Sequence, residues 1–433
     1  MFAATLAAVL MLSLCSSVAF AGWSAPQSFG VSRYATTAVA VDARGDAAVA
    51  WATRGSPSIG PRFRTSVHVT VRSANGRLST RTVWSSNDAE PLGVSVVLTA
   101  SEVTVAWGSF NRAGTGTVRA AYGPLIGRWC QPRAIGRISV PAFYPPVPWV
   151  PHLAVASDGE VLLAWSHWNG KYGHEQERRG AAVAWRAPGR RFGAPQVLPD
   201  APGGAVPQFD ARGTAYLYGY CSGLVPIAPA HTHRFGRTVV LMPRQALAFD
   251  LSLTGSGRGL ATWIAGECSF DAAAGNTPGP VFASVLSAGA FGKPLELTPA
   301  DTAAFYSNAV ATPGGGTVNW ATYGPHGSET FSLQIGTDGL SGATQQITGG
   351  LIALTADGGG DQVFGPVPVP STPIALVASP VFVRPAGGGA DQPGPGRPGQ
   401  VAVAAPVGRA VVWAWNASPT GAGSTMVLSV WRP

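Results

Sequence analysis

The sequence has few charged residues. They make up 12% of its 433 positions, whereas 46% of the positions are hydrophobic. It also contains 14 Trp, 17 Phe and 9 Tyr, which excludes a disordered polymer, because disorder goes with high net charge and few aromatic residues. Long helices are excluded as a main component, since 56 Gly and 37 Pro are poor helix residues. Together these features predict an all-β protein with many turns.

Lysine is almost absent, because Lys171 and Lys293 are the only lysines among 29 basic residues. The arginines, which give a net charge of +8, are scattered, and no basic run resembles a nucleic-acid-binding segment. We therefore expect no nucleic-acid partner. An arginine-based surface suits an anionic polymer of the cell envelope, and a GC-rich coding sequence explains it equally well.

Long uncharged apolar runs are lacking after residue 21, so no membrane span is expected there. Before that point, the segment from Phe2 to Phe20 holds no charge and leads into Ala19-Phe20-Ala21, an A-x-A cleavage site. The pattern predicts a signal peptide over residues 1–21 and a secreted or cell-surface protein that begins at Gly22. A membrane anchor is the alternative. A lipoprotein is disfavoured, because Leu14, which precedes Cys15, is not small.

One pattern recurs along the chain: an alternating apolar strand, a turn with Asp, Ser or Gly, and a second strand that ends in an aromatic residue. The clearest copy is AVAVDARGDAAVAW, which ends at Trp51. The aromatic ends lie 44 to 58 residues apart, at Trp51, Trp107, Trp165, Tyr218, Trp263, Trp320, Phe364 and Trp413. A repeat of this length is typical of a four-stranded blade, so the sequence predicts a β-propeller of about eight blades.

A second marker, an aromatic residue followed three positions later by proline, predicts the fourth strand at the outer edge of a blade, where a missing N–H donor is tolerated. It occurs at Trp23–Pro26, Trp129–Pro132, Phe192–Pro195 and Phe291–Pro294. The last unit has no such marker after its strand at 424–431, whereas the mature chain opens with one. We therefore expect the N-terminal strand to pair with the last blade and close the ring.

The seventh unit, at about 350–398, is the weakest copy. It has few aromatic residues, and it contains a low-complexity segment at 384–399 that is rich in Gly and Pro. Seven blades with an inserted linker is therefore the alternative to eight. Both alternatives place residues 22–433 in a single propeller domain.

The motif V-A-V-D-x-x-G-x-A-x-V-A-W at Val39 to Trp51 resembles the repeats of secreted actinobacterial propeller proteins that have no assigned activity, and the resemblance covers nearly the whole mature chain. The chain is distantly similar to sialidase-type propellers, whose Asp-box places an aspartate five residues before an aromatic residue. Here Asp42 precedes Trp51 by nine residues, so the box is not matched. The resemblance implies a propeller fold and carries over no sialidase activity.

Aspartates recur in the turn between the first two strands of a unit, at Asp42, Asp158, Asp210 and Asp357. An Asp followed by Gly satisfies the turn backbone and allows a positive φ. One aspartate per blade also scatters these side chains around the ring. We therefore expect them to be structural and not part of a catalytic or calcium site.

Cysteine is scarce, and loss of Cys15 with the signal peptide leaves Cys130, Cys221 and Cys268. Cys221 and Cys268 follow the aromatic ends of adjacent units at nearly the same distance. Neighbouring blades would bring them within reach in an oxidising compartment, so we predict a disulfide between them. Cys130 is then a free thiol beside Trp129.

Several motifs of catalysis and metal binding are missing, namely HExxH, a Walker loop, GxGxxG and GxSxG. His231 and His233 have the spacing of a strand chelate, but no third ligand lies near them in sequence, so a solvated turn is expected. The segment around Cys221 mimics a nucleophile elbow, yet no helix follows it. We expect neither a metal nor a cofactor.

Ligand sites of propellers usually lie on the face that carries the loops from the second to the third strand and from the fourth to the first. In this chain those loops are long, and they hold aromatic rings beside Asn, Arg and carboxylates, the groups that bind sugar rings and their hydroxyls. A plain solvated loop is the alternative. The candidate ligand-binding residues are Arg62, Arg64, Tyr144, Trp149, His167, Trp168, Tyr172, His174, Glu175 and Glu177.

The sequence thus favours an exported, monomeric propeller that binds a ligand or acts as a scaffold at the bacterial cell envelope, with a polysaccharide as a possible ligand. A carbohydrate-active enzyme, a glycoside hydrolase or lyase, is the first alternative. It would require Glu175, Glu177, Asp88 or Glu90 to converge at catalytic separations. A purely structural surface protein is the second alternative.

Overall fold

The computed structural model describes residues 22–25, 27–32, 37–53, 65–111, 116–138, 151–169, 178–199, 201–220, 222–242, 246–266, 277–324, 327–337, 339–340, 342–347, 351–356, 362–366, 382–384, 392–393, 402–404, 411–416 and 424–432. These residues form an all-β fold, and none of them lies in a helix. Accordingly, the described chain contains no helix with the length and apolar character of a membrane span. The expectation of an all-β protein is confirmed.

The described strands form antiparallel sheets of four or five strands, and strand order within most sheets follows chain order. The first sheets are β3 (Thr37–Val41), β4 (Ala47–Thr53), β5 (Thr65–Arg72) and β6 (Leu78–Ser86); β7 (Ala89–Leu98), β8 (Glu102–Asn111), β9 (Gly116–Pro124) and β10 (Arg133–Ile138); β11 (His152–Val155), β12 (Val161–Asn169), β13 (Arg178–Arg186) and β14 (Gln196–Leu198); and β15 (Gly203–Phe209), β16 (Ala215–Tyr220), β17 (Leu224–Ala228) and β18 (Arg237–Val240). The chain therefore builds one sheet after another.

The remaining sheets follow the same plan. They are β19 (Ala246–Leu253), β20 (Gly259–Ala265), β21 (Val281–Ser287), β22 (Ala290–Phe291) and β23 (Leu295–Glu296); β24 (Ala304–Thr312), β25 (Gly315–Gly324), β26 (Gly327–Gly336), β27 (Gly339–Leu340) and β28 (Gln345–Ile347); β29 (Leu351–Ala356), β30 (Gln362–Pro366), β31 (Phe382–Arg384) and β32 (Gln392–Pro393); and β33 (Ala402–Ala404), β34 (Val411–Asn416) and β35 (Ser424–Arg432), with β1 (Gly22–Trp23) and β2 (Gln27–Ser32). The seventh unit thus contributes a sheet of its own, β29 to β32.

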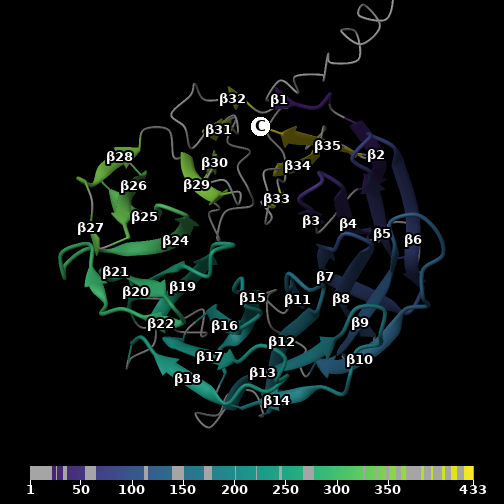
Figure 1. Cartoon of the computed structure of the whole chain (residues 1–433), viewed down its shortest axis with the longest axis horizontal. Coiled ribbons are helices and arrows are strands. Elements are labelled where there is room, and N and C mark those ends of the chain that lie inside the picture. Colours follow the sequence, from purple (N-terminus) through teal and green to yellow (C-terminus); the bar gives the residue numbers. More distant parts are fainter. Residues whose placement is uncertain are drawn as a thin grey trace, which may run out of the picture.

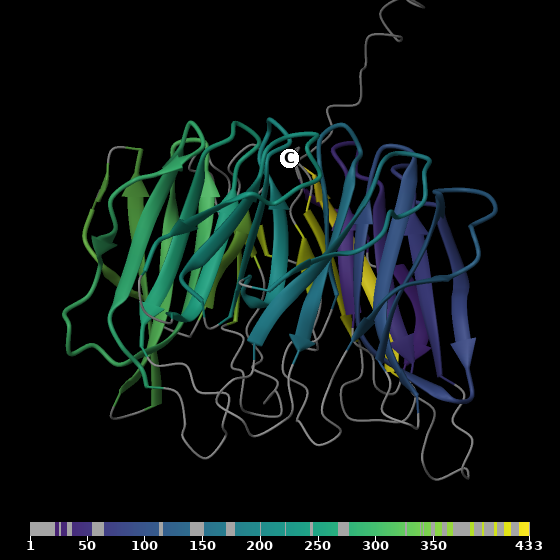
Figure 2. The ribbon, with the colours of Figure 1, turned by 90° about the horizontal axis from the view of Figure 1, so that it is seen from below.

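The sheets are arranged around a common centre, with the first strand of each sheet nearest to that centre (Figure 1). The strands run between two faces of the molecule (Figure 2). We call the face that carries the turns between first and second strands and between third and fourth strands the hairpin face. The opposite face, at the other ends of the strands, is the loop face. A side chain at either end of a strand is thereby assigned to one of the two faces.

The repeat seen in the sequence corresponds to the first two strands of a sheet. Trp51 ends the pattern in β4 and pairs with Thr37 of β3, and Trp107 pairs in the same way with Val94 of β7. The aromatic ends are buried, with 0 to 8% of their surface exposed at Trp51, Trp107, Trp165, Tyr218, Trp263 and Trp320. Alternating apolar residues put a large ring at the same depth in each of these sheets, where it anchors the packing.

The hydrophobic core lies between consecutive sheets. Ala48 and Val69 of the first sheet pack against Val96 and Trp107 of the next sheet in one cluster. The same arrangement recurs between each following pair up to the sheet of β24. Both faces of a sheet are therefore covered by apolar neighbours, which is why charged residues are rare in these strands.

The aromatic-x-x-proline marker does not form the fourth strand, as the sequence analysis expected, but comes just before it or interrupts it. Trp129 and Pro132 precede β10, and Phe192 and Pro195 precede β14. Pro294 lies between β22 and β23. The reason is that proline has no N–H to give to the ladder, so pairing stops at the proline and resumes after it.

The two ends of the described chain lie in one sheet. β1 pairs with β35 through Gly22–Arg432 and Trp23–Trp431, and β2 pairs with β35 from Gln27–Leu428 to Ser32–Ser424. Gln27 also contacts the first sheet, because its side-chain oxygen accepts a hydrogen bond of 2.6 Å from Nε of Arg72 in β5. The N-terminal strands therefore hold both the last sheet and the first.

Candidate functional site

Most residues that the sequence analysis proposed for ligand binding lie outside the described part of the chain. Within it, His167 and Trp168 belong to β12, and His167 is half-buried opposite Gly180 of β13. The residues outside it are Arg62, Arg64, Tyr144, Trp149, Tyr172, His174, Glu175 and Glu177, together with Cys221 and Cys268 of the predicted disulfide. The described residues instead bring together a different set of polar groups, on the first strands.

The first strand of a sheet is an edge strand, so its N–H groups on the outer side have no partner within the sheet. Side chains of the preceding sheet satisfy several of these groups. The hydroxyl of Ser95 in β7 accepts the N–H of Leu153 in β11 at 3.0 Å, and the carboxylate of Asp250 in β19 accepts the N–H of Ala309 in β24 at 3.0 Å. Polar residues near the centre thus join one sheet to the next.

These first strands are also irregular near the loop face. The pairing register shifts between Leu92 and Val94 in β7, between Ala246 and Phe249 in β19, and around Phe305 in β24. β15 is shifted in the same region. Such β-bulges redirect side chains and occur often beside functional sites. The irregularity marks this end of the first strands as the place to look for a ligand site.

Four polar residues from consecutive sheets meet beside this region, and we call them the Asp250 cluster: Gln208, Tyr218, Asp250 and Tyr306. The hydroxyl of Tyr218 hydrogen-bonds to the Asp250 carboxylate. The side-chain amide of Gln208 donates to the Tyr218 hydroxyl at 3.2 Å and to the carbonyl of Leu251 at 2.6 Å. Hydrogen bonds therefore connect residues of β15, β16 and β19, and Tyr306 of β24 lies close enough for the charge of Asp250 to act on it.

Burial dominates the acid–base character of the cluster. It raises the pKa of Asp250 above its ordinary value, while hydrogen bonds from the N–H groups of Ala309 and Leu251 and from Tyr218 oppose the rise. Burial and then the charge of Asp250 raise the pKa of Tyr218 and of Tyr306. Both phenols therefore stay protonated at neutral pH, and each has a hydroxyl hydrogen to donate.

The cluster is not sealed from solvent. Tyr218 is buried, with 8% of its surface exposed, whereas Gln208, Asp250 and Tyr306 are half-buried. A carboxylate, an amide and a phenol together offer both acceptors and donors of hydrogen bonds, as a ligand rich in hydroxyl groups requires. Among the described residues, no second carboxylate influences Asp250.

The residue next to Tyr306 takes part in an exposed aromatic pair. Phe305 stacks on Tyr323 of β25 with ring centroids 4.2 Å apart and an interplanar angle of 24°. Tyr323 is 66% exposed, which is unusual for a large ring. Because β24 begins and β25 ends at the loop face, this pair presents a flat apolar surface there.

His152 begins β11, the first strand of its sheet. Burial lowers its pKa from 6.5 to about 4, so the imidazole is neutral at physiological pH. A neutral imidazole contributes hydrogen bonding to its surroundings without adding positive charge.

On the hairpin face, the recurring aspartates stabilise turns, as expected. Oδ1 of Asp42 accepts the N–H groups of Arg44 and Asp46 at 2.9 and 3.0 Å, and Oδ1 of Asp210 accepts those of Arg212 and Thr214, both at 2.9 Å. Oδ1 of Asp158 does the same at Glu160. Asp357 lies outside the described residues.

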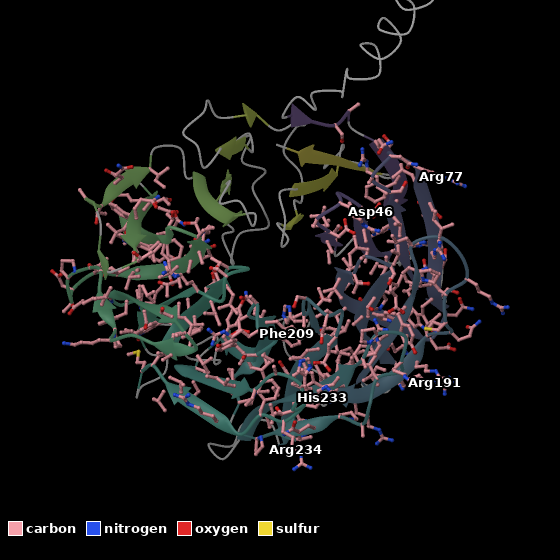
Figure 3. All side chains as sticks on the ribbon, in the orientation of Figure 1. Asp46, Arg77, Arg191, Phe209, His233 and Arg234 are labelled. Atoms are coloured by element: carbon pink, nitrogen blue, oxygen red, sulfur yellow. The ribbon has the colours of Figure 1, made fainter. Side chains whose placement is uncertain are left out.

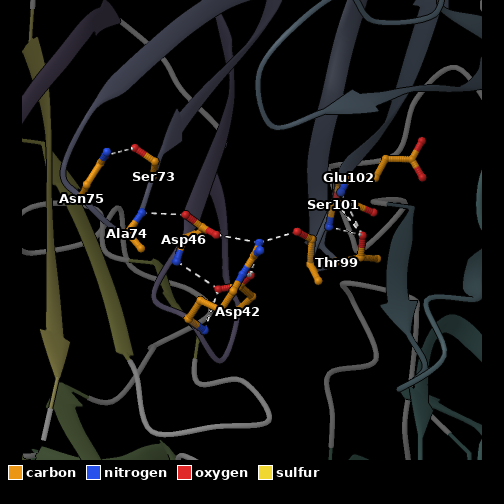
Figure 4. A network of polar contacts seen from close by, with 10 residues as sticks. Asp42, Asp46, Ser73, Ala74, Asn75, Thr99, Ser101 and Glu102 are labelled. Atoms are coloured by element: carbon orange, nitrogen blue, oxygen red, sulfur yellow. Dashed lines mark hydrogen bonds and ion pairs between the residues drawn. The ribbon is translucent and has the colours of Figure 1, made fainter.

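The first of these turns also contacts the next sheet (Figure 4). Arg44 forms ion pairs with Asp42 at 3.0 Å and Asp46 at 2.7 Å, and it donates to the carbonyl of Ala100 in the turn between β7 and β8. The other oxygen of the Asp46 carboxylate, Oδ1, accepts the N–H of Ala74 at 2.6 Å. These carboxylates stabilise the turn and join it to the rest of its sheet and to the next sheet.

His231 and His233 are exposed, as expected of a solvated turn, but each also contacts a carboxylate of the preceding sheet. Nδ1 of His231 lies 3.7 Å from Asp158, and Nε2 of His233 contacts Glu160. Sequence proximity could not reveal these partners. Within the described residues, no group of three or more His, Cys, Asp or Glu side chains is arranged to hold a metal. Cys130 is a free, half-buried thiol whose sulfur accepts the N–H of Tyr122.

The sequence analysis missed the Asp250 cluster because its members come from different repeats. One signal was present: the fourth unit has Tyr218 where the described neighbours have tryptophan, and that exchange supplies the hydroxyl that reaches Asp250. A second signal was the acidic Asp250 at a position that Ser95 and Asn308 occupy in other units.

No protein-family model matches the sequence, and no curated protein matches it. Among solved structures, the chain is similar to the GH93 α-L-arabinofuranosidase of Fusarium graminearum in complex with arabinobiose, at 8% identity over 95% of this chain and 98% of that chain, with a TM-score of 0.43. It is similar to the polysaccharide lyase Uly1 at 9% identity over 94% and 90% of the two chains (TM-score 0.43), and to a Trypanosoma rangeli sialidase at 9% identity over 70% and 54% (TM-score 0.36). At these values the likeness concerns only the propeller-like arrangement of the sheets.

Proposed function

We propose that the protein is an exported, monomeric propeller that binds polysaccharide on its loop face without cleaving it. In this proposal residues 1–21 are removed as a signal peptide. Residues 22–433 then form one domain of eight blades, closed by β1 and β2 on β35. The ligand rests on the Phe305–Tyr323 pair and extends toward the Asp250 cluster.

The observation that carries the proposal is the juxtaposition at the start of β24. Phe305, at the bulge, belongs to the exposed ring pair, and its neighbour Tyr306 lies beside Asp250. Sugar rings stack on flat aromatic surfaces through their C–H faces, while their hydroxyls need paired donors and acceptors. Two consecutive residues thus connect the two kinds of contact that a saccharide requires.

The same geometry favours binding over hydrolysis. Glycoside hydrolysis usually uses two carboxyl groups about 5 to 9.5 Å apart, one of them as an acid. In the described residues the cluster contains one carboxyl group, and that group already bonds to Ala309 and Tyr218. The raised pKa of Asp250 is the one feature that suits a general acid, so the test includes a search for cleavage.

The test is binding of neutral and acidic polysaccharides to the secreted protein, measured by affinity electrophoresis and pull-down. Tyr323→Ala removes the exposed ring and is expected to weaken retention about tenfold, and Asp250→Asn is expected to weaken it similarly, since each removes roughly 1 to 2 kcal/mol of contact. Val240→Ala, which truncates a side chain that is 58% exposed on β18, is the matched control and should bind like the wild type.

Equal retention by wild type and Tyr323→Ala for every polysaccharide that binds would refute the stacking site. Release of new sugar ends by the wild type but not by Asp250→Asn would instead establish the carbohydrate-active enzyme.

A further inference from the structure

The hairpin face carries an exposed basic residue after the third strand in each of five consecutive sheets. These residues are Arg77, Arg128, Arg191, Arg234 and Lys293. The three that Figure 3 labels, Arg77, Arg191 and Arg234, lie along the outer rim of the molecule and point outward. We call this set the basic rim. Its members follow one another around the edge and do not gather in a pocket.

The charges of the basic rim are not compensated locally. Among the described residues, no carboxylate forms an ion pair with a member of the basic rim, because the described carboxylates of this face have other partners. Asp42 and Asp46 pair with Arg44, and Glu102 pairs with the buried Arg186. Glu160 is buried against His233. The one exposed carboxylate of the described turns on this face is Asp158, and His231 lies 3.7 Å from it.

Basic residues of two neighbouring sheets lower the pKa of the same tyrosine. Burial raises the pKa of Tyr122, and the charges of Arg133 from its own sheet and of Arg186 and Arg191 from the next sheet oppose that rise. Arg212 and Arg237 act on Tyr216 in the same sense. Arg186 and Arg191 therefore act across the boundary between two sheets.

Two further exposed acidic residues lie at the opposite end of the strands. Asp88 precedes β7 and Asp301 precedes β24, and both are exposed on the loop face. The basic rim and the saccharide site proposed above therefore lie at opposite ends of the strands, and the rim does not require that site.

We propose that the basic rim binds a linear polycarboxylate, laid along the edge of the hairpin face from one sheet to the next. Arginine accounts for nearly all of the rim, and its planar guanidinium matches a carboxylate through two parallel hydrogen bonds. A chain with regularly spaced carboxylates meets one cation after another along the basic rim. A compact anion would contact one member at a time.

A lipid surface fits the rim less well. Membrane-binding faces combine basic residues with apolar side chains that enter the bilayer. Ile126, 67% exposed, is the large apolar side chain that the described turns of this face expose, whereas Val197, Val240 and Tyr323 lie on outer strands or on the loop face. The cations also occupy one continuous stretch of sheets, which suits an elongated partner.

The test uses fluorescently labelled polygalacturonate as the polycarboxylate, titrated with the full mature chain at increasing salt. The double variant Arg190→Gln/Arg191→Gln removes two charges in one turn. We expect about tenfold weaker binding at low salt and a shallower dependence of log affinity on log salt, since fewer counterions are released. Arg137→Glu, which changes the charge by the same amount at the far end of β10, is the matched control and should bind like the wild type.

Equal losses in the rim variant and in Arg137→Glu would overturn the proposal, because net charge alone would then explain binding. Rim-dependent binding of phosphatidylserine vesicles, or of duplex DNA, without binding of polygalacturonate would overturn it as well. Loss of saccharide binding by Tyr323→Ala leaves this result unaffected, so the two sites fail independently.

Discussion

At the scale of the residue, one exchange within a repeat creates most of the candidate site. The aromatic end of the pattern is tryptophan in the neighbouring sheets and tyrosine at Tyr218, whose hydroxyl extends to Asp250. Asp250 in turn occupies a position where Ser95 makes only a bond to the next first strand. Substitutions at otherwise structural positions thus add polar groups without changing the sheets around them.

His152 gives a prediction about pH. Its pKa is about 4 in the fold and near 6.5 in the unfolded chain, so the unfolded chain binds a proton between these values while the folded protein does not. The free energy of unfolding should fall as pH drops from 6.5 toward 4, by up to about 3 kcal/mol from this residue. Chemical unfolding at several pH values should show a smaller fall for His152→Asn. Parallel curves for the two proteins would contradict the assignment.

At the scale of the element, arginines at the ends of third strands fasten neighbouring sheets. Arg186 of β13 is fully buried and pairs with Glu102 of β8 at 2.8 Å. It also donates to Thr104 at 2.6 Å and lies 4.4 Å from the ring of Tyr122. Arg72 takes the equivalent place in β5 and binds Gln27. Hydrophobic packing between sheets is thereby supplemented by directional contacts near the hairpin face.

Removing one partner of the buried pair should be costly. Arg186→Met leaves Glu102 without its cation in a poorly hydrated site, and we expect a loss of about 3 to 5 kcal/mol in the free energy of unfolding. Arg186→Met/Glu102→Met should recover much of this loss, because both charges are gone. Arg190→Met, at an exposed position of the following turn, should change stability by less than about 0.5 kcal/mol. Denaturant unfolding of the wild type, of Glu102→Met and of these three variants tests this, and additive effects of the two single substitutions would rule out the coupling.

Strands and their order were predictable from the sequence because period-two alternation and turn residues act over a few positions. The prediction that the aromatic-x-x-proline marker forms the fourth strand was wrong. Proline is accepted in an edge strand, but strand pairing also stops at the proline itself, because it has no N–H to donate. The Asp250 cluster could not be found by local reasoning, because Gln208, Tyr218, Asp250 and Tyr306 meet only after four strands of three sheets have packed. The carboxylate partners of His231 and His233 were hidden for the same reason.

At the scale of the whole molecule, the two faces expose different side chains. The hairpin face uses its carboxylates internally and leaves arginines free, whereas the loop face exposes aromatic rings and carboxylates. Low overall charge in the sequence is therefore compatible with a row of exposed basic residues on one face.

The contribution of the N-terminal strands can be tested by deletion. Removing residues 22–32 takes away β1 and β2 and exposes the edge of β35, so we expect a lower thermal midpoint and concentration-dependent aggregation. A synthetic peptide of residues 22–32, added to the deleted protein, should restore the midpoint by strand addition, and a scrambled peptide should not. A deletion protein that melts like the wild type would show that these strands are dispensable for the fold.

The pairing of β1 and β2 with β35 also fixes an order of events during synthesis. β1 and β2 are the first described strands to be synthesised, and their partner β35 is the last, so they remain without that partner until nearly all of the polypeptide has been made. Closing so long a loop is the slowest kind of contact to form. A chain truncated before β35 therefore lacks the strand that pairs with β1 and β2. Both edges are covered only once β35 has been made.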